Sequence, residues 1–143
     1  MRKELKKLYA TLLLPSIMGF VLVAWAKGNH FVQIDAKHLI AVIGPFIFIL
    51  CIALAVAFPI FYRTVFAFRH RHFVSVSEEE LLKFERRLVY VVMITPYLAL
   101  TAMLLELPRF YTVTAILMGL YAGYYFYPST KRIASERSIF RVK

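Results

Sequence analysis

Long apolar runs separated by short polar segments dominate this chain. Four such runs cover residues 8–26, 39–62, 88–107 and 110–127. A helix of about 20 residues crosses the hydrocarbon core of a bilayer, so each run is long enough to span a membrane. We therefore predict an all-α integral membrane protein with four transmembrane helices.

Basic residues alternate between the segments that flank these runs. Of the 18 Lys and Arg residues, 15 lie before the first run, between the second and third runs, or in the C-terminal tail (residues 128–143). Cytoplasmic segments of membrane proteins carry an excess of Lys and Arg. We predict that both chain ends are cytoplasmic and that residues 1–143 form a single domain. The short connections and basic cytoplasmic segments favour a prokaryotic plasma (inner) membrane.

A helix start is predicted well before the third run. Ser77 is followed by Glu78, Glu79 and Glu80, which is the pattern of a capping box. A helix from near Glu78 to about Glu106 would be roughly 43 Å long at 1.5 Å per residue. We therefore expect the third helix to extend into the cytoplasm and to bend at Pro96. The short connection that follows predicts that the third and fourth helices are antiparallel neighbours.

Composition excludes several classes of protein. With 61% apolar residues and a net charge of +10, the chain resembles neither a soluble nor a disordered protein. Basic residues beside transmembrane helices also explain the charge without nucleic acid, because they attract anionic headgroups. The single cysteine, Cys51, excludes a disulfide framework and a thiol redox pair. The first run lacks a small-x-small cleavage site at its end, so we expect it to be retained rather than cleaved as a signal peptide.

The fourth run carries small residues at a spacing of four, namely Ala115, Gly119 and Gly123. Small residues on one face of a membrane helix let another helix approach closely. Two interpretations remain open for this stripe. It packs against the third helix of the same chain, or it forms the interface of a homo-oligomer or with a partner subunit.

Polar side chains also occur deep within the third and fourth runs, at Tyr97, Thr101 and Tyr121. In a dry environment each hydroxyl needs a hydrogen-bond partner. Hydrogen bonds between helices would satisfy them. The alternative is a polar pocket that receives a lipid or quinone headgroup.

The predicted cytoplasmic face carries a group of arginines next to aromatic residues. These arginines are Arg63, Arg69, Arg71, Arg86 and Arg87. We expect them to contact anionic lipid headgroups or an acidic partner. The C-terminal tail is short and amphipathic, and we expect it to rest on the membrane surface.

Metal, cofactor and catalytic sites are not predicted. The histidines of the chain are His30, His38, His70 and His72. None falls in the centre of an apolar run, which excludes a bis-histidine haem between transmembrane helices, and Arg69 and Arg71 beside His70 would repel a divalent cation. Glu106 is expected to form a salt bridge with Arg109 across the outer turn. The sequence offers no phosphate-binding loop, zinc spacing or nucleophilic triad.

The favoured function is therefore non-catalytic. We expect a structural, assembly or accessory subunit that binds other membrane components. An oligomeric channel or transport component is the first alternative, and a membrane enzyme acting on lipid or quinone is the second.

Overall fold

A computed structural model describes residues 2–29, 37–70 and 76–140, and its regular elements are all helices. In chain order they are α1 (Arg2–Gly28), α2 (Lys37–Ile52), the π-helical turn η1 (Ala53–Ala57), α3 (Phe58–Arg69), α4 (Glu78–Val92), α5 (Ile94–Leu104), α6 (Arg109–Tyr125) and α7 (Thr130–Ile139). The predicted all-α architecture is confirmed for these residues.

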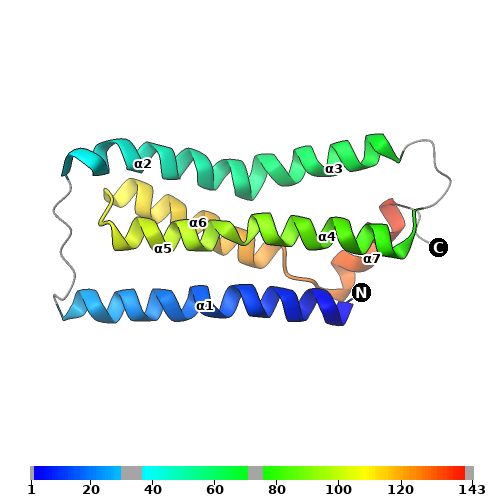
Figure 1. Ribbon diagram of the computed structural model, residues 1–143, viewed down its shortest axis with the longest axis horizontal. Coiled ribbons are helices and arrows are strands. Elements are labelled where there is room, and N and C mark those ends of the chain that lie inside the picture. Colours follow the sequence, from blue (N-terminus) through cyan, green and yellow to red (C-terminus); the bar gives the residue numbers. More distant parts are fainter. Residues whose placement is uncertain (1, 30–36, 71–75, 141–143) are drawn as a thin grey trace.

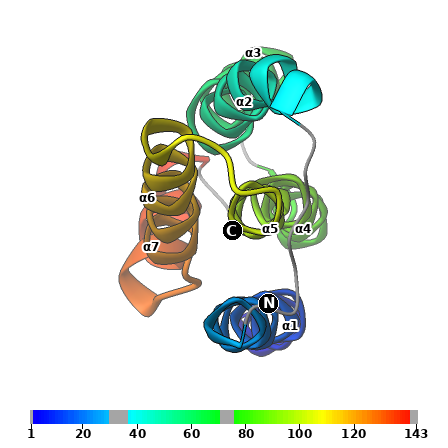
Figure 2. The ribbon, with the colours of Figure 1, turned by 90° about the vertical axis from the view of Figure 1, so that its left-hand side faces the viewer.

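The helices form a bundle of parallel and antiparallel rods (Figure 1). Helices α2, η1 and α3 make one rod, and α4 and α5 make another. The rod of α4 and α5 lies between α1 on one side and α2–α3 on the other, with α6 alongside (Figure 2). The most extensive packing is between α5 and α6, which confirms that the third and fourth apolar runs are antiparallel neighbours. The first turn of α1 and helix α7 lie at the same end of the bundle (Figure 1).

Three helices in the described part of the chain are long and apolar enough to cross a membrane. They cover Lys3–Gly28, Ile40–Arg69 and Glu78–Leu104. Helix α6 is shorter, with 17 residues. The molecule is therefore a helical membrane protein by length and composition.

Prolines disturb both long rods one turn before their own positions. The Phe58 N–H donates to the Ala53 carbonyl, five residues back, in the turn that precedes Pro59. Because proline lacks an N–H and its ring crowds the carbonyl four residues earlier, the helix widens into a π turn there. In the other rod, α4 ends and α5 begins around Met93, three residues before Pro96. The disturbance predicted at Pro96 thus takes the form of an interrupted helix.

The start of the third apolar helix is as predicted. The Ser77 hydroxyl accepts a hydrogen bond from the Glu80 N–H at 3.3 Å, and Glu78 opens α4. This cap satisfies one of the free N–H groups at the helix start. The first helical residue, Glu78, lies ten residues before the start of the apolar run at residues 88–107.

The turn between α5 and α6 closes two residues earlier than expected. Helix α5 ends at Leu104, and Glu106 adopts a positive φ of 53°. The Leu107 N–H then donates to the Ala102 carbonyl at 3.2 Å, as in the helix-ending motif that a left-handed residue permits. The predicted end near Glu106 was wrong because this residue leaves the helical conformation to reverse the chain.

The C-terminal tail does not lie apart from the bundle. Residues 130–139 form α7, whose start is capped by Ser129. Phe140 packs against Phe66 and Phe84, with ring centroids 5.0 and 5.9 Å apart. Aromatic and charged side chains of the tail are thus engaged by α3 and α4, and its contact with the membrane surface stays a prediction.

Candidate functional site

The small-residue stripe of α6 contacts other helices of the same chain. A Cβ atom added at Gly119 would lie 3.4 Å from Pro96 Cα, and one added at Gly123 would lie 3.7 Å from Leu13 Cδ1. Ala115 is fully buried in the cluster that joins α2, α5 and α6. The stripe thus packs α6 against α5 and, at Gly123, against α1.

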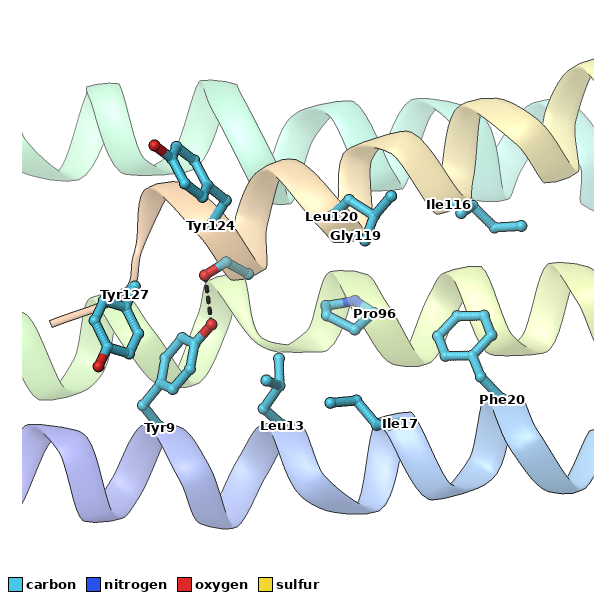
Figure 3. A pocket seen from close by; sticks show the side chains of 11 residues that line it. Tyr9, Leu13, Ile17, Phe20, Pro96, Ile116, Gly119, Leu120, Tyr124 and Tyr127 are labelled. Carbon is cyan, nitrogen blue, oxygen red and sulfur yellow. Dashed lines mark hydrogen bonds between the residues drawn. The ribbon is translucent and has the colours of Figure 1, made fainter.

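A groove opens between α1 and α6, with α5 at its floor. It has a volume of about 430 Å³. The residues that line it are apolar apart from three tyrosines, and they are Tyr9, Leu13, Ile17, Phe20, Pro96, Ile116, Gly119, Leu120, Gly123, Tyr124 and Tyr127. Figure 3 shows that side chains from α1 and α6 face one another across Pro96. We call this cavity the lateral groove.

One end of the lateral groove is closed by a polar contact. The Tyr9 hydroxyl donates to the Gly123 carbonyl, so α1 and α6 are joined at this point (Figure 3). The Tyr9 ring also packs edge-on against Tyr127, with centroids 5.5 Å apart. The hydroxyl of Tyr9 is therefore used within the chain, and the body of the groove is hydrocarbon.

The structure does not join the predicted polar residues Tyr97, Thr101 and Tyr121 in one pocket. The Tyr97 hydroxyl donates to the Leu12 carbonyl at 2.6 Å, which links α5 to α1. The Thr101 hydroxyl donates to the Tyr97 carbonyl at 2.9 Å, within its own helix. The Tyr121 ring stacks on Tyr125, one turn along α6. Two of the three hydroxyls are thus satisfied by backbone carbonyls.

The predicted cytoplasmic arginines separate into different environments. The Arg63 guanidinium donates to the buried carboxylate of Glu136. Arg69 and Arg87 line a cavity between α3 and α4, whereas Arg86 does not line it, and all three residues are exposed. Arg71 lies outside the described residues. Of the four arginines that the structure describes, Arg63 is thus paired within the chain, and Arg86 lies apart from the two that line the cavity.

Two buried ion pairs at this end were missed by the sequence analysis. Glu85 and Glu136 are only 3% and 4% exposed. Arg132 Nη2 lies 2.7 Å from Glu85 Oε2, and Arg63 pairs with Glu136 as described above. The sequence signal for Glu85 is its position on the apolar face of α4, where buried Leu81 and Val89 lie four residues to either side.

These pairs hold α7 against α3 and α4. Arg132 Nη1 also donates to the Phe126 carbonyl at 2.6 Å, and its guanidinium lies 4.9 Å from the Phe126 ring centre. Within the described residues, one oxygen of Glu85 and one of Glu136 are buried without a hydrogen-bond partner. Because an unpaired buried charge is costly, removing one member of either pair would leave the other strongly destabilised.

The predicted salt bridge between Glu106 and Arg109 is wrong. Glu106 Oε1 instead lies 3.3 Å from Lys27 Nζ at the end of α1. Glu106 has a left-handed φ of 53° in the turn that precedes α6. The contact ties the end of α1 to the turn between α5 and α6.

The histidines are only partly described. His70 Nδ1 lies 3.0 Å from the Phe66 carbonyl, and its Nε2 lies 3.9 Å from Glu80. His30 and His72 lie outside the described residues, and the side chain of His38 is not described. Among the described residues, no three potential metal ligands gather at one point.

Comparisons of the chain with protein-family models, curated proteins and solved structures find no match.

Proposed function

We propose that this protein is a non-catalytic accessory or assembly subunit that binds another membrane protein at the lateral groove. The groove itself carries this proposal. Its volume of about 430 Å³ falls within the range of about 300–1,000 Å³ that is typical of binding sites. It runs along the middle of α1, at Leu13, Ile17 and Phe20, and would therefore face the lipid rather than water.

The lining favours binding over catalysis. Proton transfer or nucleophilic attack needs an acid, a base or an activated nucleophile. The groove offers hydrocarbon and three tyrosines, of which Tyr9 is already hydrogen-bonded within the chain. Such a lining binds an apolar molecule through complementary shape.

The occupant that fits best is a transmembrane segment of a partner protein. Apolar side chains of α1 and α6 face one another across the groove, and helices in a bilayer associate largely by van der Waals packing of such surfaces. Leu120 projects at its edge and is 64% exposed, so it is available to a partner. A second copy of this chain and a lipid chain are the competing occupants, and the experiment below separates them.

We further infer that α6 crosses the membrane as a fourth span and that both chain ends are cytoplasmic. At 17 residues, α6 reaches about 26 Å, near the short limit for spanning. Its antiparallel packing on α5 supports this inference. The gathering of 15 of 18 basic residues on one predicted side supports cytoplasmic ends, and a prokaryotic inner membrane remains the proposed location.

Crosslinking from the groove tests the proposed function. A photoreactive residue at position 120 should trap a partner protein in native membranes. The same residue at position 117 should trap no partner, because Leu117 does not line the groove. Leu117 is a matched control, since it lies on the same helix and is 57% exposed. Leu120→Trp should then lower recovery of that partner in mild detergent, and Leu117→Trp should leave it unchanged.

The outcome identifies the occupant. A crosslinked product at twice the mass of the chain would assign a second copy instead of a partner. Crosslinks to lipid only, or equal trapping from positions 117 and 120, would contradict the proposal.

A further inference from the structure

A second cavity lies between α3 and α4, at the end of the bundle that carries α7. It has a volume of about 280 Å³. Its lining combines aromatic and charged residues, namely Tyr62, Val65, Phe66, Arg69, His70, Glu80, Lys83, Phe84 and Arg87. We call it the cationic pocket. It shares no residue with the lateral groove.

The floor of the cationic pocket is a packed stack of rings. Phe84 stacks on Tyr62 with centroids 5.1 Å apart and on Phe66 with centroids 4.3 Å apart. Phe84 is itself buried in the cluster that includes Phe140. The floor is therefore fixed by α3, α4 and the residue that follows α7, and it offers an apolar surface of defined shape.

The rim of the pocket carries an excess of positive charge. Arg69 comes from α3, and Lys83 and Arg87 lie one turn apart on α4, where residues four apart share a face. Glu80 is the one carboxylate in the lining and lies near His70. The rim thus presents three cations against a single acid.

These cations differ from the paired arginines at the same end of the molecule. Arg63, Arg132 and Arg137 each form an ion pair with a glutamate. Within residues 2–29, 37–70 and 76–140, no carboxylate lies within 4.0 Å of the side-chain nitrogens of the rim cations. Their charge is available to an anion from outside the chain.

The position of the pocket indicates where that anion comes from. Tyr62 ends the second apolar run, and Arg87 immediately precedes the third. The pocket therefore lies where an apolar rod enters the polar headgroup region. Basic pockets at the cytoplasmic ends of membrane helices are suited to anionic headgroups, and arginine pairs with phosphate in a bidentate geometry.

We propose that the cationic pocket binds the phosphate of an anionic phospholipid from the cytoplasmic leaflet. The rim holds the phosphate, while the ring stack contacts the adjoining glycerol and acyl carbons. A zwitterionic lipid fits less well, because its ammonium group would face three cations. This inference is independent of the partner proposed for the lateral groove.

Lipid titration of the purified full-length protein tests the proposal. Phosphatidylglycerol, dissolved in the same mild detergent as the protein, is added stepwise, and native mass spectrometry counts the lipid that remains bound. Phosphatidylcholine is the zwitterionic comparison. Arg87→Gln should weaken phosphatidylglycerol binding about fivefold to tenfold, since one cation near a membrane surface contributes on this scale. Lys83→Gln combined with Arg87→Gln should weaken it further.

Arg86→Gln is the matched control. It removes the same charge one residue away, from an exposed side chain that does not line the pocket, and should leave binding unchanged. Equal weakening by Arg86→Gln and Arg87→Gln would overturn the proposal, because it would show diffuse attraction rather than a site. Equal retention of the two lipids would also overturn it.

Inorganic phosphate distinguishes the source of the anion. If the lipid is the ligand, millimolar phosphate should not displace it, because the ring stack adds contacts that the free ion lacks. Displacement by phosphate would overturn the lipid assignment in favour of a soluble phosphate compound. Failure of the unsubstituted protein to retain phosphatidylglycerol would also overturn the proposal.

Discussion

Single residues at the end of the bundle that carries α7 show how this small protein stabilises a charged interior. Glu85 and Glu136 are buried among rings and helices, yet each meets an arginine from another element. The pairs join residues 47 and 73 positions apart in the chain. Because the low dielectric strengthens both the attraction and the penalty for losing a partner, these residues act as a unit.

Removal of one acid from this unit should be far more damaging than removal of both charges. We expect Glu85→Leu to destabilise the protein by about 3–5 kcal/mol, because Arg132 is left buried without its acid. Glu85→Leu combined with Arg132→Met should recover much of this loss. Thermal unfolding in detergent measures both variants. Glu78→Gln is the control, since the exposed Arg137–Glu78 pair should contribute less than about 1 kcal/mol. Equal losses in the single and double variants would contradict this account.

The backbone conformation of Glu106 affects the stability of the protein. Its φ of 53° is unfavourable for a residue with a Cβ by about 1–2 kcal/mol, whereas glycine adopts it freely. We expect Glu106→Gly to be more stable than Glu106→Gln by up to about 1 kcal/mol. Both variants lose the contact with Lys27, so the difference between their free energies of unfolding reports the cost of the left-handed backbone conformation. Unfolding of the two variants under identical detergent conditions measures it, and a more stable Gln variant would count against the left-handed turn.

At the scale of elements, what the sequence could predict depends on how local each contact is. The apolar runs and the Ser77 cap involve residues close together in the chain, and they were predictable from spacing. The position of α7 was not, because its partners on α3 and α4 are remote in sequence and its own pattern is weakly amphipathic. The link from Glu106 to Lys27 was missed for the same reason. It depends on the end of α1 lying next to the turn between α5 and α6.

The lateral groove and the cationic pocket were likewise outside the reach of the sequence. Arg69 and Arg87 were predicted as contact residues, but Lys83 and the ring stack beneath them were not. Their association depends on the relative rotation of α3 and α4. Tyr97 and Tyr121 were grouped because both lie deep in their runs, and the structure directs them to different partners.

The contact between α5 and α6 yields a prediction about helix packing. A side chain at position 119 would begin with its Cβ 3.4 Å from the Pro96 backbone, which cannot move without displacing α5. We expect Gly119→Leu to destabilise the protein by about 1–3 kcal/mol, as overpacking does. Gly28→Leu should have little effect, because no atom lies within 4 Å of a Cβ placed there. Thermal unfolding in detergent distinguishes them, and a neutral Gly119→Leu would show that α6 packs differently.

For the whole molecule, the distribution of charge has two separate consequences. Three ion pairs at one end connect α7 to α3 and α4, and they fix where the chain end lies relative to the bundle. The remaining excess of cations at that end is the basis of the proposed orientation, because cytoplasmic segments of membrane proteins are rich in Lys and Arg. If α6 crosses the bilayer, α7 reaches the same side as the first turn of α1 (Figure 1). The position that the ion pairs give α7 is then consistent with the side that the basic residues favour.

Labelling from outside the cell tests whether α6 crosses the membrane and places both chain ends in the cytoplasm. Cys51 is buried and can be replaced by serine to give a background without thiols. In that background Glu4→Cys, Arg109→Cys and Ser138→Cys each place one exposed thiol on α1, α6 or α7. An impermeant maleimide should label position 109 in intact cells, and positions 4 and 138 only after the membrane is permeabilised. Labelling of position 138 in intact cells, with position 4 protected, would mean that α6 does not cross. Helix α7 could then not meet Glu85 and Arg63 on the cytoplasmic side, so the same result would contradict the ion-pair network together with the topology.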